Sequence, residues 1–197
     1  MNEVLIKQSK TSILLNLISC DYKRIKKNTG KGSITKYINL CFSNAGFRAV
    51  FLYRLGRFFY LSKTPIIPGL CQRLMHHLAH CWISVNADIG PGFLIAHVGG
   101  IIIGGDTVIG KNCDIRQNVT FGGNFNKVSS DNRSQPTLAD NISICVGAVI
   151  VGPVKIGSNS IIGANSVVTR DIPENVIASG IPATVIKNRW NNNERFL

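Results

Sequence analysis

The feature that most constrains the fold is a six-residue periodicity in the second half of the chain. Between residues 83 and 168 an aliphatic or aromatic residue recurs at every sixth position, and a glycine often follows it directly. The phase slips by two residues at Gly99-Gly100, is lost between residues 122 and 137, and then resumes. The unit starts are Ile83, Ile89, Ile95, Ile103, Ile109, Ile115, Phe121, Leu138, Ile144, Ile150, Ile156, Ile162 and Val168.

A repeat of this length predicts a parallel β-helix. Each unit supplies a short strand and a turn, and three units close one coil of about 18 residues with the aliphatic residue inside and Gly, Asn or Asp at the corner. A single unit cannot bury its apolar face, so the coils must stack. The alternative is a β-sandwich, whose strands alternate with period two. The unbroken six-residue steps from Ile144 to Val168 favour the solenoid.

Composition divides the chain near residue 80. Residues 1–80 hold 13 Lys and Arg against two acids, whereas residues 81–197 hold nine against eight and carry 14 of the 19 glycines. Apolar residues between 47 and 59 recur at steps of three and four, which predicts a helix. We expect a basic helical segment at 1–80, a β-helix at 81–175 with an extruded loop at 122–137, and a C-terminal tail at 176–197.

Several protein classes are excluded. The six cysteines are widely spaced in a chain too large to need disulfides, which favours free thiols. No stretch reaches the roughly 18 apolar residues of a membrane span. The apolar run Ile13–Ser19 is seven residues long and is interrupted by Asn16, so no signal peptide is expected. His76 and His80 share a helical face with no metalloprotease motif, so no metal is expected. These features predict a cytoplasmic protein.

The excess positive charge of residues 1–80 leaves three interpretations open. The basic, Phe-rich helix could contact an anionic membrane surface peripherally, at the inner membrane, or its field could attract an anionic polysaccharide. It could equally be an ordinary helical cap on the first coil. Nucleic-acid binding is not expected, because the charge is joined to no recognised nucleic-acid module.

Residues 83–187 resemble the left-handed parallel β-helix of the hexapeptide-repeat acyltransferases, and most closely the serine acetyltransferase-like branch. The resemblance implies acetyl-CoA as co-substrate, no permanently bound cofactor, and a homotrimer with the coenzyme between neighbouring subunits. It is carried by Ile89-Gly90-Pro91-Gly92-Phe93-Leu94-Ile95-Ala96-His97, Gly100-Ile101-Ile102-Ile103-Gly104, Gln117-Asn118-Val119-Thr120-Phe121-Gly122-Gly123, Ile162-Gly163-Ala164-Asn165-Ser166-Val167-Val168-Thr169-Arg170-Asp171-Ile172-Pro173 and Gly180-Ile181-Pro182-Ala183.

Acyl transfer to a hydroxyl needs a general base, and His97 matches the family's catalytic histidine. It is the only histidine after residue 80, and an imidazole can accept a proton near neutral pH. The resemblance also implies that the loop at 122–137 overhangs the substrate cleft. Expected acceptor-side residues are Gln117, Arg133 and Gln135, and the expected coenzyme-binding residues are Gly123, Gly147, Ala164, Thr169, Arg170 and Lys187.

Three departures from the serine acetyltransferase pattern affect the acceptor side. Ala96 stands where the family has an acidic residue before its histidine, Trp82 replaces an orienting Asp, and the loop reads Arg133-Ser134-Gln135-Pro136 where the family has Arg-His-Pro. We therefore expect the acceptor to be a sugar hydroxyl of a bacterial surface polysaccharide or its precursor. Serine O-acetylation in cysteine biosynthesis is the alternative, and a non-catalytic scaffold is a second. Three carboxylates are left open as partners of His97: Asp88, Asp106 and Asp114.

Overall fold

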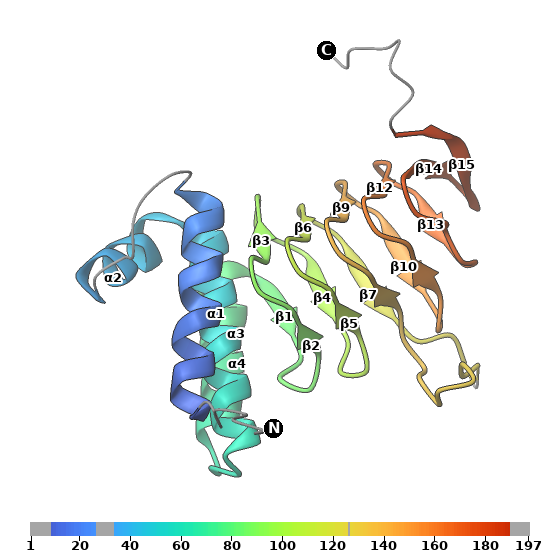
Figure 1. Cartoon of the computed structure of the whole chain (residues 1–197). Coiled ribbons are helices and arrows are strands. Elements are labelled where there is room, and N and C mark those ends of the chain that lie inside the picture. Colours follow the sequence, from blue (N-terminus) through green and yellow to red (C-terminus); the bar gives the residue numbers. More distant parts are fainter. Residues whose placement is uncertain (1–8, 27–33, 126, 190–197) are drawn as a thin grey trace, which may run out of the picture.

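The computed structural model describes residues 9–26, 34–125 and 127–189 of the 197-residue chain. Within them, the helices lie at one end of a stack of parallel coils, and the stack extends away from the helices (Figure 1). The predicted β-helix is confirmed. The helices are α1 (Lys10–Ile25), α2 (Ile34–Ser43), α3 (Ala45–Leu61) and α4 (Ile67–Ala79).

Three sheets form the sides of the solenoid, and every pair of neighbouring strands is parallel except the last pair in sheet C. Sheet A consists of β1 (Cys81–Ile83), β4 (Ile101–Ile103), β7 (Thr120–Gly122), β10 (Val149–Val151) and β13 (Val167–Val168). Sheet B consists of β2 (Asp88–Ile89), β5 (Val108–Ile109), β8 (Thr137–Leu138) and β11 (Lys155–Ile156). Sheet C consists of β3 (Leu94–Ile95), β6 (Asp114–Ile115), β9 (Ser143–Ile144), β12 (Ile161–Ile162), β14 (Val176–Gly180) and β15 (Ala183–Asn188).

The core is a set of aliphatic columns inside the three sheets. Each residue that starts a six-residue unit is buried, and strand register places it directly on its counterpart in the next coil, as with Ile115 on Ile144 and Ile144 on Ile162. Burying such side chains is the main favourable contribution to folding. The sequence period therefore maps onto the columns residue by residue.

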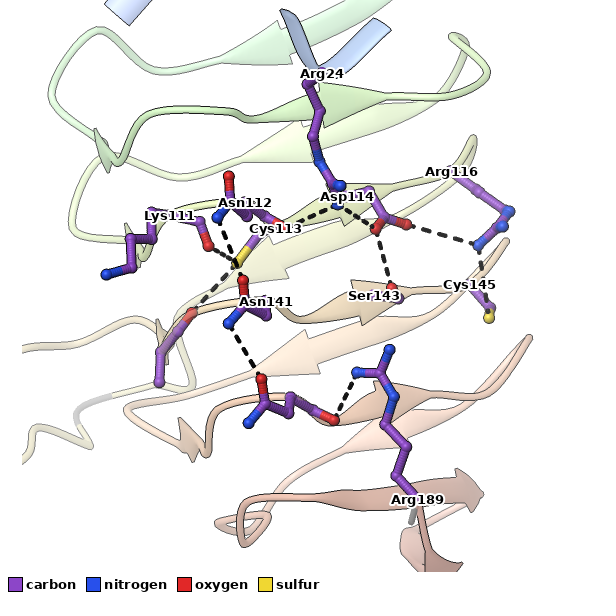
Figure 2. A network of polar contacts seen from close by, with 12 residues as sticks. Arg24, Lys111, Asn112, Cys113, Asp114, Arg116, Asn141, Ser143, Cys145 and Arg189 are labelled. Atoms are coloured by element: carbon purple, nitrogen blue, oxygen red, sulfur yellow. Dashed lines mark hydrogen bonds and ion pairs between the residues drawn. The ribbon is translucent and has the colours of Figure 1, made fainter. Parts of the chain in front are cut away.

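Asparagines make the corner between sheets B and C. Asn112, Asn141, Asn159 and Asn175 all have a left-handed backbone, which Asn tolerates better than other residues with a Cβ. Their side chains form a ladder, in which Asn112 donates to Asn141 at 3.4 Å and Asn141 donates to Asn159 at 3.1 Å (Figure 2). The ladder keeps successive coils in register.

The helices cap the open end of the first coil, as one of the three interpretations of the basic segment expected. The guanidinium of Arg54 on α3 is buried, pairs with Asp21 of α1 at 2.9 Å, and donates to the carbonyls of Ile89 and Gly90. Asp21 in turn accepts from the backbone N–H of Phe93 at 2.9 Å. These contacts bury the charge of Arg54 inside the protein, so this arginine cannot bind a membrane or a polymer.

The segment expected as a tail begins with an antiparallel hairpin of β14 and β15, and residues 190–197 lie outside the described part. The domain division at 1–80, 81–175 and 176–197 stays a prediction. Among the described helices none has the length and apolarity needed to span a membrane.

Candidate functional site

His97 lies on the corner that leads from sheet C to sheet A, which we call the histidine corner (residues 96–100, 116–119, 145–148 and 163–166). Counted in strand register, the first coil takes two residues more than the next to pass this corner, because paired residues differ by 20 at Ile95–Ile115 and by 18 at Ile102–Thr120. Val98 packs against the core and anchors the longer corner. His97 is exposed, so its imidazole is open to a ligand.

Gly99 and Gly100 complete this turn. Both have positive φ, at 108° and 64°, where residues with a side chain are strained. A Cβ at Gly100 would also clash with Oδ1 of Asn118 in the next coil. The sequence slip at these glycines thus creates the projecting corner that carries the histidine.

Three further predicted residues share the histidine corner. Gln117, Gly147 and Ala164 lie in successive coils. The Gly147 N–H donates to the Gln117 carbonyl at 3.1 Å, and one coil further the Asn165 N–H donates to the Val146 carbonyl in the same way. Oε1 of Gln117 is buried and has no hydrogen-bond partner among the described residues. A buried acceptor without a donor costs stability, and this oxygen is covered by the protein itself rather than open to a ligand.

The other predicted residues lie on the corner between sheets A and B, which we call the loop corner (residues 104–107, 123–136, 152–154 and 169–171). The extruded loop leaves the solenoid here, between β7 and β8 (Figure 1). Arg133 pairs with Asp106 at 3.6 Å and Asp131 at 3.7 Å, while Gln135 accepts from Thr107 at 2.9 Å. Located on this corner are Gly123, Arg133, Gln135, Thr169 and Arg170.

The predicted site residues therefore form two groups, one where the chain enters the strands of sheet A and one where it leaves them. A single chain does not bring the two groups together. Lys187 belongs to neither group. It lies on β15, opposite Ile177 of sheet C.

The three carboxylates considered as partners of His97 are held elsewhere. Asp88 pairs with Arg57 at 2.9 Å, Asp106 accepts from Ser134, and Asp114 accepts from Ser143 at 3.0 Å. In the described part of the chain no hydrogen bond or ion pair joins His97 to a carboxylate.

All six cysteines are free, and burial raises the pKa of Cys41 and of Cys113 to about 11, so both stay thiols at neutral pH. Within the described residues no group of three or more His, Cys, Asp or Glu side chains is arranged to hold a metal ion.

Arg116, which precedes Gln117 on the histidine corner, is not among the residues predicted from the sequence. Its Nη1 lies 4.0 Å from Oδ2 of Asp114 and 3.9 Å from Sγ of Cys145 (Figure 2). The signal was present, because Arg116 follows the inward Ile115 as Ala96 follows the inward Ile95. Only the 20-residue register between these coils shows that the two positions are neighbours.

No protein-family model matches the chain. It is 37% identical over 147 residues to a serine acetyltransferase of Synechococcus elongatus, which covers 75% of this chain and 58% of that protein. It is also 31% identical over 150 residues to a serine acetyltransferase of Bacillus pumilus, covering 76% of this chain and 68% of that protein. The chain thus spans little more than half of the length of the first relative and about two thirds of the second.

Solved structures agree with these relatives. The Neisseria gonorrhoeae serine acetyltransferase in complex with serine superposes with a TM-score of 0.74 at 28% identity, covering 88% of this chain and 69% of that chain. A serine acetyltransferase in complex with CoA gives the same TM-score at 26% identity, covering 88% of this chain and 69% of that chain.

These relatives overturn the expectation of a polysaccharide acceptor, which is wrong. The similar proteins are serine acetyltransferases, so the findings support the alternative acceptor, serine. The error came from reading Ala96, Trp82 and Gln135 as the loss of an amino-acid site.

Proposed function

The chain belongs to the serine acetyltransferase family, and from this premise we propose that it transfers an acetyl group from acetyl-CoA to the hydroxyl of L-serine. The observation that carries the proposal is the histidine corner. It presents an exposed His97 on a turn that the chain lengthens by two residues, with Gln117 in the next coil. The product, O-acetylserine, would feed cysteine biosynthesis, and the expected cytoplasmic location stays part of this proposal.

In the proposed reaction His97 acts as general base. Its imidazole accepts the proton of the serine hydroxyl as the oxygen attacks the thioester carbon of acetyl-CoA. The carbon–sulfur bond then breaks, and the leaving thiolate of coenzyme A takes the proton from the imidazolium. The acetyl group ends on the serine oxygen, and His97 returns to its neutral form.

The coenzyme would lie along small residues and meet basic ones. The pantetheine arm would lie against Gly147 and Ala164 on the histidine corner, with backbone N–H and C=O groups as partners. Across sheet A, Gly123 and Thr169 would line the coenzyme. Arg170, which is exposed, and Lys187 would bind its phosphates.

A homotrimer would unite the two groups of residues. In a threefold ring with sheet A turned to the axis, the histidine corner of one copy faces the loop corner of the next. The outward side of sheet A supports this arrangement, since Trp82 and Ile102 are adjacent in register and are 47% and 48% exposed. In register beyond them lie Thr120 on β7 and then Val149 and Val167 on β10 and β13, so the outward row is apolar at every position but Thr120.

Light scattering on a gel-filtration column tests the trimer. We expect wild type to elute at three times the 21.5 kDa chain mass and Ile102→Glu to elute as a monomer, because three carboxylates would be buried around one axis. Ile186→Glu is the matched control, since Ile186 on β15 is 62% exposed on a different sheet. A monomeric wild type, or a trimeric Ile102→Glu, contradicts this arrangement.

Coenzyme binding is testable by thermal unfolding. A ligand that binds only the folded state at 100 times its dissociation constant stabilises it by about 2.7 kcal/mol. We expect CoA to raise the Tm of wild type, and to raise that of Arg170→Ala less at the same concentration, because one phosphate contact is lost. An unchanged Tm for wild type at saturating CoA would remove the basis of the transferase assignment.

A further inference from the structure

Arg116 lies in the coil next to His97, on the same corner. The backbone N–H of Ala96 donates to the carbonyl of Ile115 at 3.0 Å, which places Ala96 against the start of Arg116. Ile115 points into the core and is fully buried, so the alternation of the strand turns Arg116 outward, where its side chain is 40% exposed. The guanidinium therefore shares the outer surface with Ala96 and His97.

The guanidinium of Arg116 is poorly matched within the protein. Both of its contacts are long and both involve Nη1, at 4.0 Å to Asp114 and 3.9 Å to Cys145. Asp114 is already engaged, because its Oδ1 accepts from Ser143 at 3.0 Å and lies 3.4 Å from Arg24 (Figure 2). By contrast, Arg57 holds Asp88 at 2.9 Å. Arg116 thus keeps donors that can bind an anion.

The residue beside it explains why this cation is not neutralised. The family pattern has an acidic residue before the histidine, and this chain has Ala96 instead. Alanine therefore offers Arg116 no carboxylate partner from the first coil, and the printed contacts of the guanidinium run to Asp114 of its own coil and to Cys145 of the coil beyond.

We propose that Arg116 is the specificity-determining residue that binds the carboxylate of the amino-acid acceptor, an inference that rests on the proposed function. The planar guanidinium binds a carboxylate with two parallel hydrogen bonds. With the carboxylate held in the next coil, the hydroxyl of serine is directed towards His97. The chain thus binds serine through Arg116, in the coil next to His97. It does not need the family residues that Trp82, Ala96 and Gln135 replace.

Steady-state kinetics with two acceptors tests this role. L-Serine is compared with ethanolamine, which is serine without its carboxylate, in wild type, Arg116→Leu and Arg116→Lys. We expect Arg116→Leu to raise the KM for serine by roughly tenfold to a hundredfold, since hydrogen bonds to charged groups are the strong ones. The KM for acetyl-CoA and the rate with ethanolamine should stay within about twofold of the wild-type values. The serine KM of Arg116→Lys should lie between those of wild type and Arg116→Leu.

Arg24→Leu is the matched control, because it removes the other guanidinium of Asp114 but lies on α1. It should leave the serine KM unchanged. If Arg116→Leu and Arg116→Lys keep the wild-type serine KM, or if ethanolamine loses as much rate as serine, the inference is wrong while the proposed function stands. If wild type does not acetylate serine at all, the proposed function fails and the inference with it. Should Arg116→Leu not fold, the serine KM of Arg116→Lys alone decides.

Discussion

Replacing His97 with alanine is expected to lower kcat for acetyl transfer to serine by about a hundredfold to ten-thousandfold, the usual contribution of a general base. The side chain is exposed on a corner fixed by its backbone and by Val98, so its removal should not disturb the fold. The KM for acetyl-CoA should change little, because the proposed coenzyme contacts lie in other coils. Release of free thiol from acetyl-CoA gives both quantities.

His77→Ala is the control for this variant. His77 is an exposed histidine on α4, outside both corners, and its replacement should leave kcat unchanged. A His97→Ala protein that folds, binds CoA and keeps more than about a tenth of the wild-type kcat would show that another group takes the proton.

Replacing Asp21 with alanine is expected to cost about 3–5 kcal/mol of unfolding free energy, the usual penalty for breaking a buried ion pair. Asp21 and Arg54 are each 1% exposed in their side chains, and the pair joins α1, α3 and the first coil. Burial raises the pKa of Asp21, and the charge and hydrogen bonds of Arg54 oppose that shift. Without the carboxylate, the guanidinium stays buried without its counter-ion. Urea unfolding followed by circular dichroism measures the loss.

Asp88→Ala provides the comparison, because it also removes the partner of an α3 arginine. The Asp88 side chain is 69% exposed, and exposed ion pairs contribute only about 0–1 kcal/mol. Equal losses from the two substitutions would mean that Asp21 and Arg54 do not anchor the helices to the β-helix.

The β-helix was predictable because each six-residue unit places its aliphatic residue in the same column. From Ile144 to Ile162 the strand register follows the sequence period without exception. The helical cap was only one of several options, since nothing in the sequence pairs Asp21 with Arg54, 33 residues away. Such a pair becomes visible only when α1 and α3 are packed together.

The candidate site was predictable only in part. His97 and Gln117 stand in recognisable motifs, and the structure places both on one corner. The position of Arg133 and Arg170 across sheet A could not be read from the motifs, because it depends on which corner each residue occupies. The acceptor was misjudged because Ala96 was compared only with its family counterpart. Arg116, its neighbour in the next coil, was not considered.

Identification of the product tests directly whether the enzyme acetylates serine. Wild type is incubated with acetyl-CoA and L-serine, and with acetyl-CoA and a panel of sugars and oligosaccharides, and each mixture is analysed by mass spectrometry. We predict O-acetylserine in the first mixture, its loss in His97→Ala, and no acetylated saccharide in the others. An acetylated saccharide with unmodified serine would contradict the account.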